Sequence, residues 1–299
     1  MPHPERMPVI PIPVALRAGA FTVAQARAAG LGAGRLSGPD LSRPTHGVRS
    51  LARPETFRDR VVATQVALPS DVAFSHLTSA RLWGLPLPRE LEDGPIDVMR
   101  RTSAARVRRR GCVGRRGLES RATARNQGLL LTSLEDTWCD LGEALELDDL
   151  VVVGDAVVRR LADVTPLRDA LLRRVRPRGA VALRSALGLI RVGSDSPMES
   201  CCRLVFHRAG LPEPELNAVI THRGGGFLCR ADFVWRERRV LAEYQGSDHF
   251  ESFRRGDDDI SRRLLLEDDG WKYVEMTKRD YYNPGRQAGL VARLAAYLL

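Results

Sequence analysis

Lysine is almost missing from this sequence: among 299 residues only Lys272 and Lys278 occur, and arginine supplies the rest of the 46 basic residues. No run of about 18 apolar residues is present, so we expect no transmembrane helix. The first twenty residues are interrupted by proline and lack the charged-then-apolar order of a secretory signal peptide, so we expect a cytoplasmic protein.

Cysteine is scarce as well, and its spacing excludes two classes of protein. The five cysteines contain no C-x-x-C pair, so the sequence supports neither a zinc ribbon nor a disulfide framework. We therefore expect no zinc.

Positive charge is concentrated in one segment of the chain. Residues 100–128 contain ten arginines and a single acid, Glu119, which equals the net charge of +9 of the whole chain. We expect an exposed hairpin there that contacts DNA phosphates, and the alternative is a solvated arginine-rich surface. The residues that we expect to bind phosphate are Arg108, Arg109, Arg110, Arg115 and Arg116. A second set in the N-terminal part is Arg35, Arg43 and Arg49.

The sequence pattern divides the chain into three parts and predicts an α+β fold. Residues 1–55 contain a short helix that starts with capping-box spacing at Thr22 and Gln25, a glycine turn and a second short element. This order is typical of a small winged-helix module. Residues 56–189 alternate helical and strand patterns and form an α+β middle domain.

Residues 190–299 read as helix, strand, hairpin, helix, strand and closing helix, an α/β/α layout around a mixed sheet. The first helix begins at Ser196, and Pro197 occupies its first helical position. Glu199 completes S-x-x-E, so helix capping alone accounts for this acid on local grounds.

Two carboxylates stand in the hairpin expected over 227–245. If 236–239 form the loop, paired residue numbers sum to 475, and 232 + 243 = 475 makes Asp232 and Glu243 neighbours on one face. Like charges in such positions destabilise a sheet, whereas a divalent cation with oxygen ligands would convert the repulsion into a site. The alternative is that Glu243 pairs with an arginine such as Arg230.

The order of a helix Glu, a strand Asp and Glu-x-Gln on the next strand resembles the PD-(D/E)XK nuclease core. More narrowly, residues 190–299 resemble the very-short-patch-repair-like endonuclease domain (DUF559), through "SPMES", "LPEPELN", "FLCRADFVW", "AEYQGSDHF" and "ISRRLLLEDDGWKYVEMT". The front two-thirds resemble AbiEi-like antitoxin proteins with a winged helix, through "FTVAQARAAGLG", "HGVRS", "FSHLTSARLWGLP" and "VVVGDAVVRR".

The nuclease resemblance implies a set of catalytic residues. Glu199 matches the helix acid, and Asp232 and Glu243 match the ligands of Mg²⁺ or Mn²⁺. Gln245 stands where the core pattern has a lysine that orients or activates the attacking water, and His249 matches a histidine after a glycine turn. The resemblance also implies DNA as the partner.

We expect one of two functions. The first is a magnesium-dependent DNA endonuclease or nickase, in which Lys272 or Arg230 replaces the missing lysine. The second is a DNA-binding transcriptional regulator or antitoxin-like protein, with or without a toxin partner, whose nuclease fold is inactive.

Overall fold

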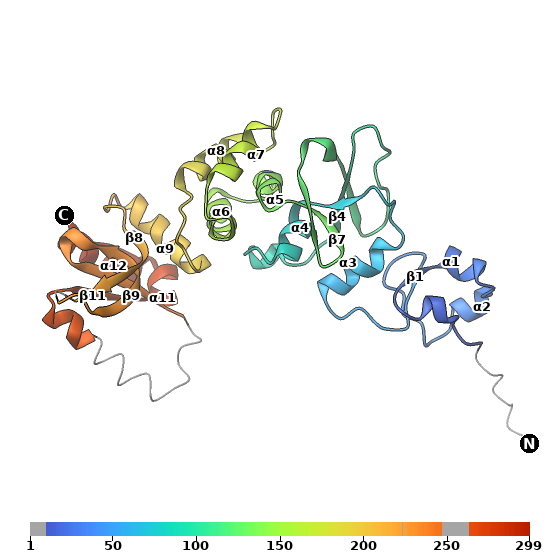
Figure 1. The fold of residues 1–299 in the computed structure, drawn as a ribbon, viewed down its shortest axis with the longest axis horizontal. Coiled ribbons are helices and arrows are strands. Elements are labelled where there is room, and N and C mark those ends of the chain that lie inside the picture. Colours follow the sequence, from blue (N-terminus) through green and yellow to red (C-terminus); the bar gives the residue numbers. More distant parts are fainter. Residues whose placement is uncertain (1–9, 223, 247–262) are drawn as a thin grey trace, which may run out of the picture. The chain divides into compact units, whose positions relative to one another are not determined.

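The structure is a computed structural model that describes residues 10–222, 224–246 and 263–299. The fold is α+β with two mixed sheets, of five and four strands, which agrees with the predicted fold class (Figure 1). Within the described ranges, no helix is both long and apolar enough to cross a membrane.

Contacts between residues divide the chain into two compact units. The first comprises residues up to Gly84 and Pro88–Thr137, and the second comprises Leu85–Leu87 and Trp138–Leu299. The boundary that we expected at 189/190 lies inside the second unit, because helix α6 (Leu147–Leu161) packs against helix α9 (Pro197–Arg208).

The N-terminal part of the first unit holds short elements only. They are η1 (Val14–Leu16), β1 (Phe21–Thr22), α1 (Val23–Ala28), α2 (Ala33–Leu36) and β2 (Val48–Arg49), with β1 and β2 antiparallel. The predicted capping box is confirmed, since the Thr22 side chain accepts the Gln25 N–H and Gln25 reaches back to the Thr22 backbone. The second helix has four residues, which is less than the two turns that the sequence left room for.

The five-stranded sheet has the order β5-β4-β3-β7-β6. The elements of this part are α3 (Phe57–Gln65), β3 (Ala73–Phe74), α4 (His76–Trp83), η2 (Arg89–Leu91), β4 (Ile96–Arg100), β5 (Cys112–Arg116), η3 (Leu118–Ser120), β6 (Thr123–Asn126) and β7 (Leu129–Thr132). Apolar residues of α3 and of strands β3, β4 and β7 form its core, including Val61, Phe74, Val98 and Leu131.

The arginine-rich segment is not the hairpin that we predicted. β4 and β5 pair in parallel, from Ile96↔Cys112 to Arg100↔Arg116, so residues 101–111 must cross from one end of the pair to the other. The hairpin of this segment lies further on, between β6 and β7. Its turn residues Gln127 and Gly128 have φ of +46° and +85°, as a type I′ turn requires.

The second unit begins with helices. They are α5 (Leu134–Asp140), which crosses the boundary between the units, η4 (Leu141–Glu143), α6, α7 (Thr165–Leu172) and α8 (Ala180–Leu189). Residues 150–158 of α6 are all buried. The start of α8 approaches η4 so closely that a Cβ on Gly179, which has φ of +69°, would lie 1.7 Å from the Gly142 carbonyl oxygen. A glycine is therefore needed at this contact.

The four-stranded sheet of the second unit has the order β11-β10-β9-β8. Its elements are α9, β8 (Glu215–Thr221), β9 (Phe227–Trp235), η5 (Arg236–Arg238), β10 (Val240–Gln245), helical residues 263–268, β11 (Lys272–Thr277), α11 (Lys278–Tyr282) and α12 (Pro284–Leu298). This order is the predicted one with the addition of α11. β10 is antiparallel to β9 and parallel to β11.

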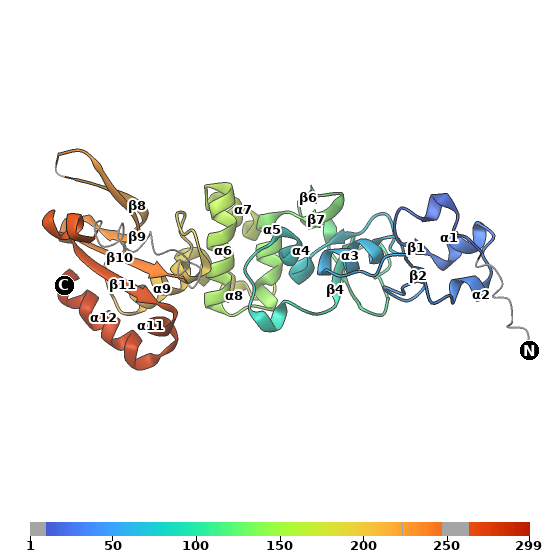
Figure 2. The ribbon, with the colours of Figure 1, turned by 90° about the horizontal axis from the view of Figure 1, so that it is seen from below.

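Helices cover both faces of this sheet. One core joins α9 and α12 to β9, β10 and β11 through residues such as Phe206, Phe233 and Leu294, and Figure 2 shows α12 running along the sheet. A second core on the other face contains Leu241 of β10 and Leu266 of the helical stretch 263–268. The result is the α/β/α layering expected for this part of the chain.

Candidate functional site

Every strand of the four-stranded sheet carries a polar residue at one level. Three β9–β10 pairs have residue numbers that sum to 475, which confirms the predicted register, and this ladder ends at Phe233 and Ala242, one residue before Asp232 and Glu243. The β8–β9 pairs around Asp232 sum to 449, so Asn217 stands opposite it (217 + 232 = 449). Glu243 pairs with Glu275 of β11. We call Asn217, Asp232, Glu243 and Glu275 the polar row.

The environment of Asp232 shifts the pKa of this acid strongly. Its Oδ2 accepts a hydrogen bond from the Tyr244 backbone N–H at 2.7 Å, which ties β9 to β10 where their ladder ends. Burial raises the pKa of Asp232 to about 7; the charges of Glu199 and Glu243 act in the same direction, and the Tyr244 amide and Arg230 oppose it. The acids from α9, β9 and β10 therefore converge closely enough to influence one another.

Glu199 is held in place by more than a helix cap. The Ser196 Oγ accepts the Glu199 N–H at 3.2 Å, as the capping pattern predicted. The carboxylate itself accepts hydrogen bonds from the Asp195 N–H at 2.8 Å and from the Asn217 side-chain amide at 2.6 Å. Because Asn217 belongs to the polar row, this bond brings the α9 acid to the level of Asp232.

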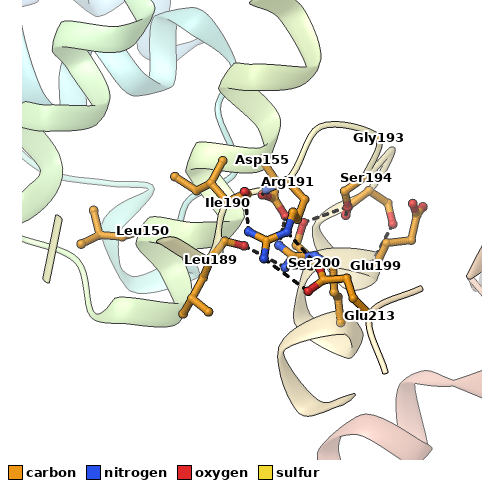
Figure 3. A network of polar contacts seen from close by, with 12 residues as sticks. Leu150, Asp155, Leu189, Ile190, Arg191, Gly193, Ser194, Glu199, Ser200 and Glu213 are labelled. Atoms are coloured by element: carbon orange, nitrogen blue, oxygen red, sulfur yellow. Dashed lines mark hydrogen bonds and ion pairs between the residues drawn. The ribbon is translucent and has the colours of Figure 1, made fainter. Parts of the chain in front are cut away.

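The start of α9 is anchored to α6 by a buried polar network (Figure 3). Arg203 of α9 and Asp155 of α6 form an ion pair of 2.7 Å, and their side chains are only 2% and 1% exposed. The hydroxyls of Ser194 and Ser200 lie 2.9 Å apart beside it. These contacts fix the helical turn that presents Glu199.

Glu243 is 6% exposed and interacts with β11. The Tyr273 hydroxyl donates a hydrogen bond to its Oε2 at 2.9 Å. Burial raises the pKa of Tyr273, and the Glu243 charge acts in the same direction, so the hydroxyl keeps its proton and remains a donor. Gln245, at the position of the family lysine, is a second hydrogen-bonding neighbour of Tyr273.

Lys272 does not replace the family lysine. It lies opposite Val240, three residues along β11 from Glu275, so alternation points it to the face opposite that of Glu243. Its Nζ lies 4.4 Å from the ring centroid of Tyr297 of α12. The hypothesis that Lys272 serves the acids is therefore wrong.

Arg230 is the cation that the structure places near Asp232, since its charge lowers the pKa of that acid. Its guanidinium forms an ion pair with Asp195 at 2.5 Å and donates to the Asn217 carbonyl at 3.0 Å. The alternative interpretation of Glu243 was an ion pair with Arg230. The structure instead shows Arg230 paired with Asp195. His249 lies outside the described residues.

The carboxylates near Asp232 limit the kind of metal site that this part of the chain could form. Within the described part of the chain, no group of three or more His, Cys, Asp or Glu side chains is arranged to hold a metal ion. Asp232 and Glu243 remain a two-carboxylate set, and Mg²⁺ is commonly held by one or two carboxylates with waters and phosphate oxygens. The raised pKa of Asp232 fits such an ion, because a nearby cation favours the charged carboxylate.

Two of the three N-terminal arginines hold their own module together. Arg35 makes a two-pronged ion pair with Asp40, at 2.9 and 2.7 Å, and only 6% of its side chain is exposed. Arg49 donates to the Leu36 carbonyl at 2.7 Å, and burial lowers its pKa. Arg43 is exposed. Of this set, Arg43 is the residue for which the expectation of phosphate contact stays open.

The five arginines expected to bind phosphate separate into two groups. Arg115 forms an ion pair of 3.2 Å with the buried Asp97, and Arg109 donates to the His46 carbonyl. These two side chains are therefore bound within the protein, which differs from the exposed positions expected for them. The other three are exposed: Arg108, Arg110 and Arg116.

Sequence reasoning missed three residues that the structure brings into these sites. Asn217 and Tyr273 hold the carboxylates of Glu199 and Glu243. Both stand in stretches that resemble the nuclease domain, "LPEPELN" and "ISRRLLLEDDGWKYVEMT", but neither was assigned a role. Arg106 lines a pocket with Arg108 and was passed over. Its signal was present, since in "ARVR" the two arginines alternate with an apolar valine.

No protein-family model matches the chain. Two uncharacterized proteins of Mycobacterium tuberculosis, Rv2248 of strain H37Rv and MT2308 of strain CDC 1551 / Oshkosh, are each 29% identical to it over 258 residues, covering 85% of this chain and 92% of the relative. Among solved structures, the RV2827C protein from M. tuberculosis matches 62% of this chain and 75% of its own, with a TM-score of 0.38 and 16% identity.

Proposed function

We propose that this protein binds DNA and that its C-terminal part, residues 190–299, contains a metal-dependent endonuclease or nickase site that hydrolyses phosphodiester bonds. The observation that carries the proposal is the convergence of Glu199, Asp232 and Glu243 from three elements, with the pKa of Asp232 raised to about 7. Buried like charges at one point are costly unless a cation joins them. DNA as the partner makes the cytoplasm the proposed compartment.

Each residue has a proposed task in this reaction. Asp232 and Glu243 would hold Mg²⁺ or Mn²⁺, and the ion, when bound, would activate water and neutralise charge on the phosphate. Tyr273 keeps one oxygen of Glu243 occupied and so directs the carboxylate. Asn217 and the Asp195 N–H fix one oxygen of Glu199 beside Asp232. Because Gln245 stands at the lysine position, the site lacks the family lysine. Arg230 is the cation proposed to contact the scissile phosphate in its place.

The test is nicking of supercoiled plasmid with Mg²⁺ or Mn²⁺. We expect Asp232→Asn and Glu243→Gln to abolish nicking, because each removes a charge from the proposed ligand set. Glu237→Gln is the matched control, since Glu237 is an exposed acid in the loop of the same hairpin. Equal nicking by all four proteins would rule out the site.

A DNA-binding regulator or antitoxin-like protein with an inactive nuclease fold is the second candidate. It is favoured by Gln245 at the lysine position and by Lys272 lying on the other face of the sheet. It predicts salt-sensitive DNA binding without nicking by the wild type. Calorimetry separates the two, because tight Mn²⁺ binding that is lost in Glu243→Gln supports the nuclease.

A further inference from the structure

An arginine-lined pocket opens in the first unit, and the residues that line it precede the polar row by about 100 positions in the sequence. Its volume is about 640 Å³, and its lining comprises Ala105, Arg106, Arg108 and Arg116. Pockets that hold small ligands or parts of larger ones typically measure about 300–1,000 Å³. The loop 101–111 supplies three of these residues and the end of β5 supplies the fourth.

A close backbone contact fixes the loop over β5. A Cβ on Gly114 would lie 2.2 Å from the Val107 carbonyl oxygen and 2.8 Å from Arg106 Cγ, so the loop rests directly on this glycine. Val107 packs against the core of the five-stranded sheet. Arg106 and Arg108, one on either side of it, are exposed. The same contact that buries the valine thus presents both arginines.

The other wall of the pocket is set by the parallel register of β4 and β5. Arg116 pairs with Arg100 and shares a face of β5 with Gly114, over which the loop passes. Arg100 forms an ion pair with Asp71 at 2.9 Å and donates to the Ala105 carbonyl at 2.8 Å. It therefore holds the loop against the strand that carries Arg116.

The lining is positively charged without an acid to balance it. Among the described residues, none forms an ion pair with Arg106, Arg108 or Arg116, whereas Arg115 in the same segment is paired with Asp97. Like charges gathered in one pocket repel, and a bound anion relieves that repulsion. Guanidinium groups present planar pairs of N–H donors that match phosphate oxygens.

We infer that this pocket is a phosphate-binding subsite in which Arg106, Arg108 and Arg116 hold a backbone phosphate of DNA. The inference rests on the proposed function only for the choice of DNA, because a free nucleotide offers the same phosphate chemistry. Arg109 and Arg115 are structural residues in this account, since the His46 carbonyl and Asp97 occupy them.

The experiment compares two triple variants with the same loss of three charges. The pocket variant is Arg106→Ser, Arg108→Ser and Arg116→Ser, and the control is Arg89→Ser, Arg101→Ser and Arg125→Ser, which removes exposed arginines of the same unit outside the lining. Binding to labelled duplex DNA is measured in EDTA between 50 and 200 mM salt. Three lost phosphate contacts reduce the salt slope by about 2.7, so the wild type should lose about 40-fold more affinity over this range than the pocket variant.

The control should keep a slope near that of the wild type. If the salt slope fell equally in both variants, the effect would come from total charge and the inference would be overturned. Unchanged binding of both DNA and nucleotide by the pocket variant would also overturn it. A nucleotide monophosphate is titrated in parallel. Nucleotide binding that only the pocket variant loses, with DNA binding unchanged, would keep the phosphate site and assign it to free nucleotides.

Two further measurements separate a loss of phosphate binding from a loss of folding and from a loss of nicking. If circular dichroism shows the pocket variant unfolded, the single changes Arg108→Ser and Arg125→Ser replace the triples, with a slope change of about one unit expected for Arg108 only. Asp232→Ala should bind DNA in EDTA as the wild type does. Loss of nicking and loss of pocket binding are therefore separate outcomes.

Discussion

Replacing Asp232 by Asn should make the protein more stable at alkaline pH and remove part of its pH dependence. The pKa of this acid rises from an ordinary 3.8 to about 7 on folding, so the folded protein binds the proton more tightly than the unfolded chain does. The resulting stabilisation is complete below pH 3.8 and is lost as the pH rises through about 7.

The size of the effect follows from these two pKa values. Integrated from pH 5 to pH 8, the wild type loses up to about 3 kcal/mol of unfolding free energy through Asp232, and less to the extent that solvent reaches the side chain. Asparagine does not titrate, and its side-chain oxygen can still accept the Tyr244 N–H. The variant should therefore gain on the wild type across this range.

The assay is urea denaturation of both proteins at pH 5, 6, 7 and 8 in EDTA, followed by fluorescence. The difference between the two proteins isolates the effect of the substitution, because the rest of the sequence is identical. At pH 8, Mg²⁺ at 100 times its dissociation constant should restore about 2.7 kcal/mol to the wild type and nothing to the variant. Parallel stability curves for both proteins from pH 5 to pH 8 would refute the burial argument for Asp232.

Two other changes test the packing of the second unit. Asp155→Ala should cost about 3–5 kcal/mol of unfolding free energy, because it strands the buried Arg203, and a variant that loses less than 1 kcal/mol in urea denaturation would contradict this. Gly179→Ala should cost more than the roughly 1–2 kcal/mol of a left-handed backbone, since its Cβ also meets the Gly142 carbonyl; a melting temperature equal to that of the wild type would argue against the contact.

The geometry of the β9–β10 hairpin followed from the sequence. A loop with an even number of residues keeps the sum of paired residue numbers at 475, which predicts Asp232 and Glu243 as cross-strand neighbours. The structure confirms this register at three pairs, with η5 and Arg239 in the loop. Local rules were sufficient because the partners lie close together in the chain.

Strand direction was beyond the reach of local patterns. Alternating apolar and polar residues look alike in parallel and antiparallel pairs, and 101–111 is shorter than the dozen residues that usually connect parallel strands. An arginine-rich hairpin was therefore the natural expectation for β4 and β5, and it was wrong. The partners of Arg109 and Arg115 depend on that direction, so they were missed with it.

The compact units divide the chain near residue 137, away from the boundaries that the sequence pattern predicts, for a related reason. Asp155 and Arg203 lie 48 residues apart and join α6 to α9 in one compact unit. Helix and strand periodicity cannot predict a contact between residues so far apart in the sequence. The change of pattern near residue 190 therefore predicted a domain boundary there. The nuclease resemblance covers 190–299 only, so it favoured the same division.

The strand order of the first unit has a consequence for how the chain is made. β3 lies in the middle of its sheet, where Phe74 pairs with Leu131 of β7, which follows 57 residues later in the chain (131 − 74 = 57). At about 5–20 residues per second, a ribosome needs about 3–11 s to deliver that partner. Until then one edge of β3 is open, and an open apolar edge invites pairing with other chains. The exposure of this strand during synthesis is thus set by the rate of translation.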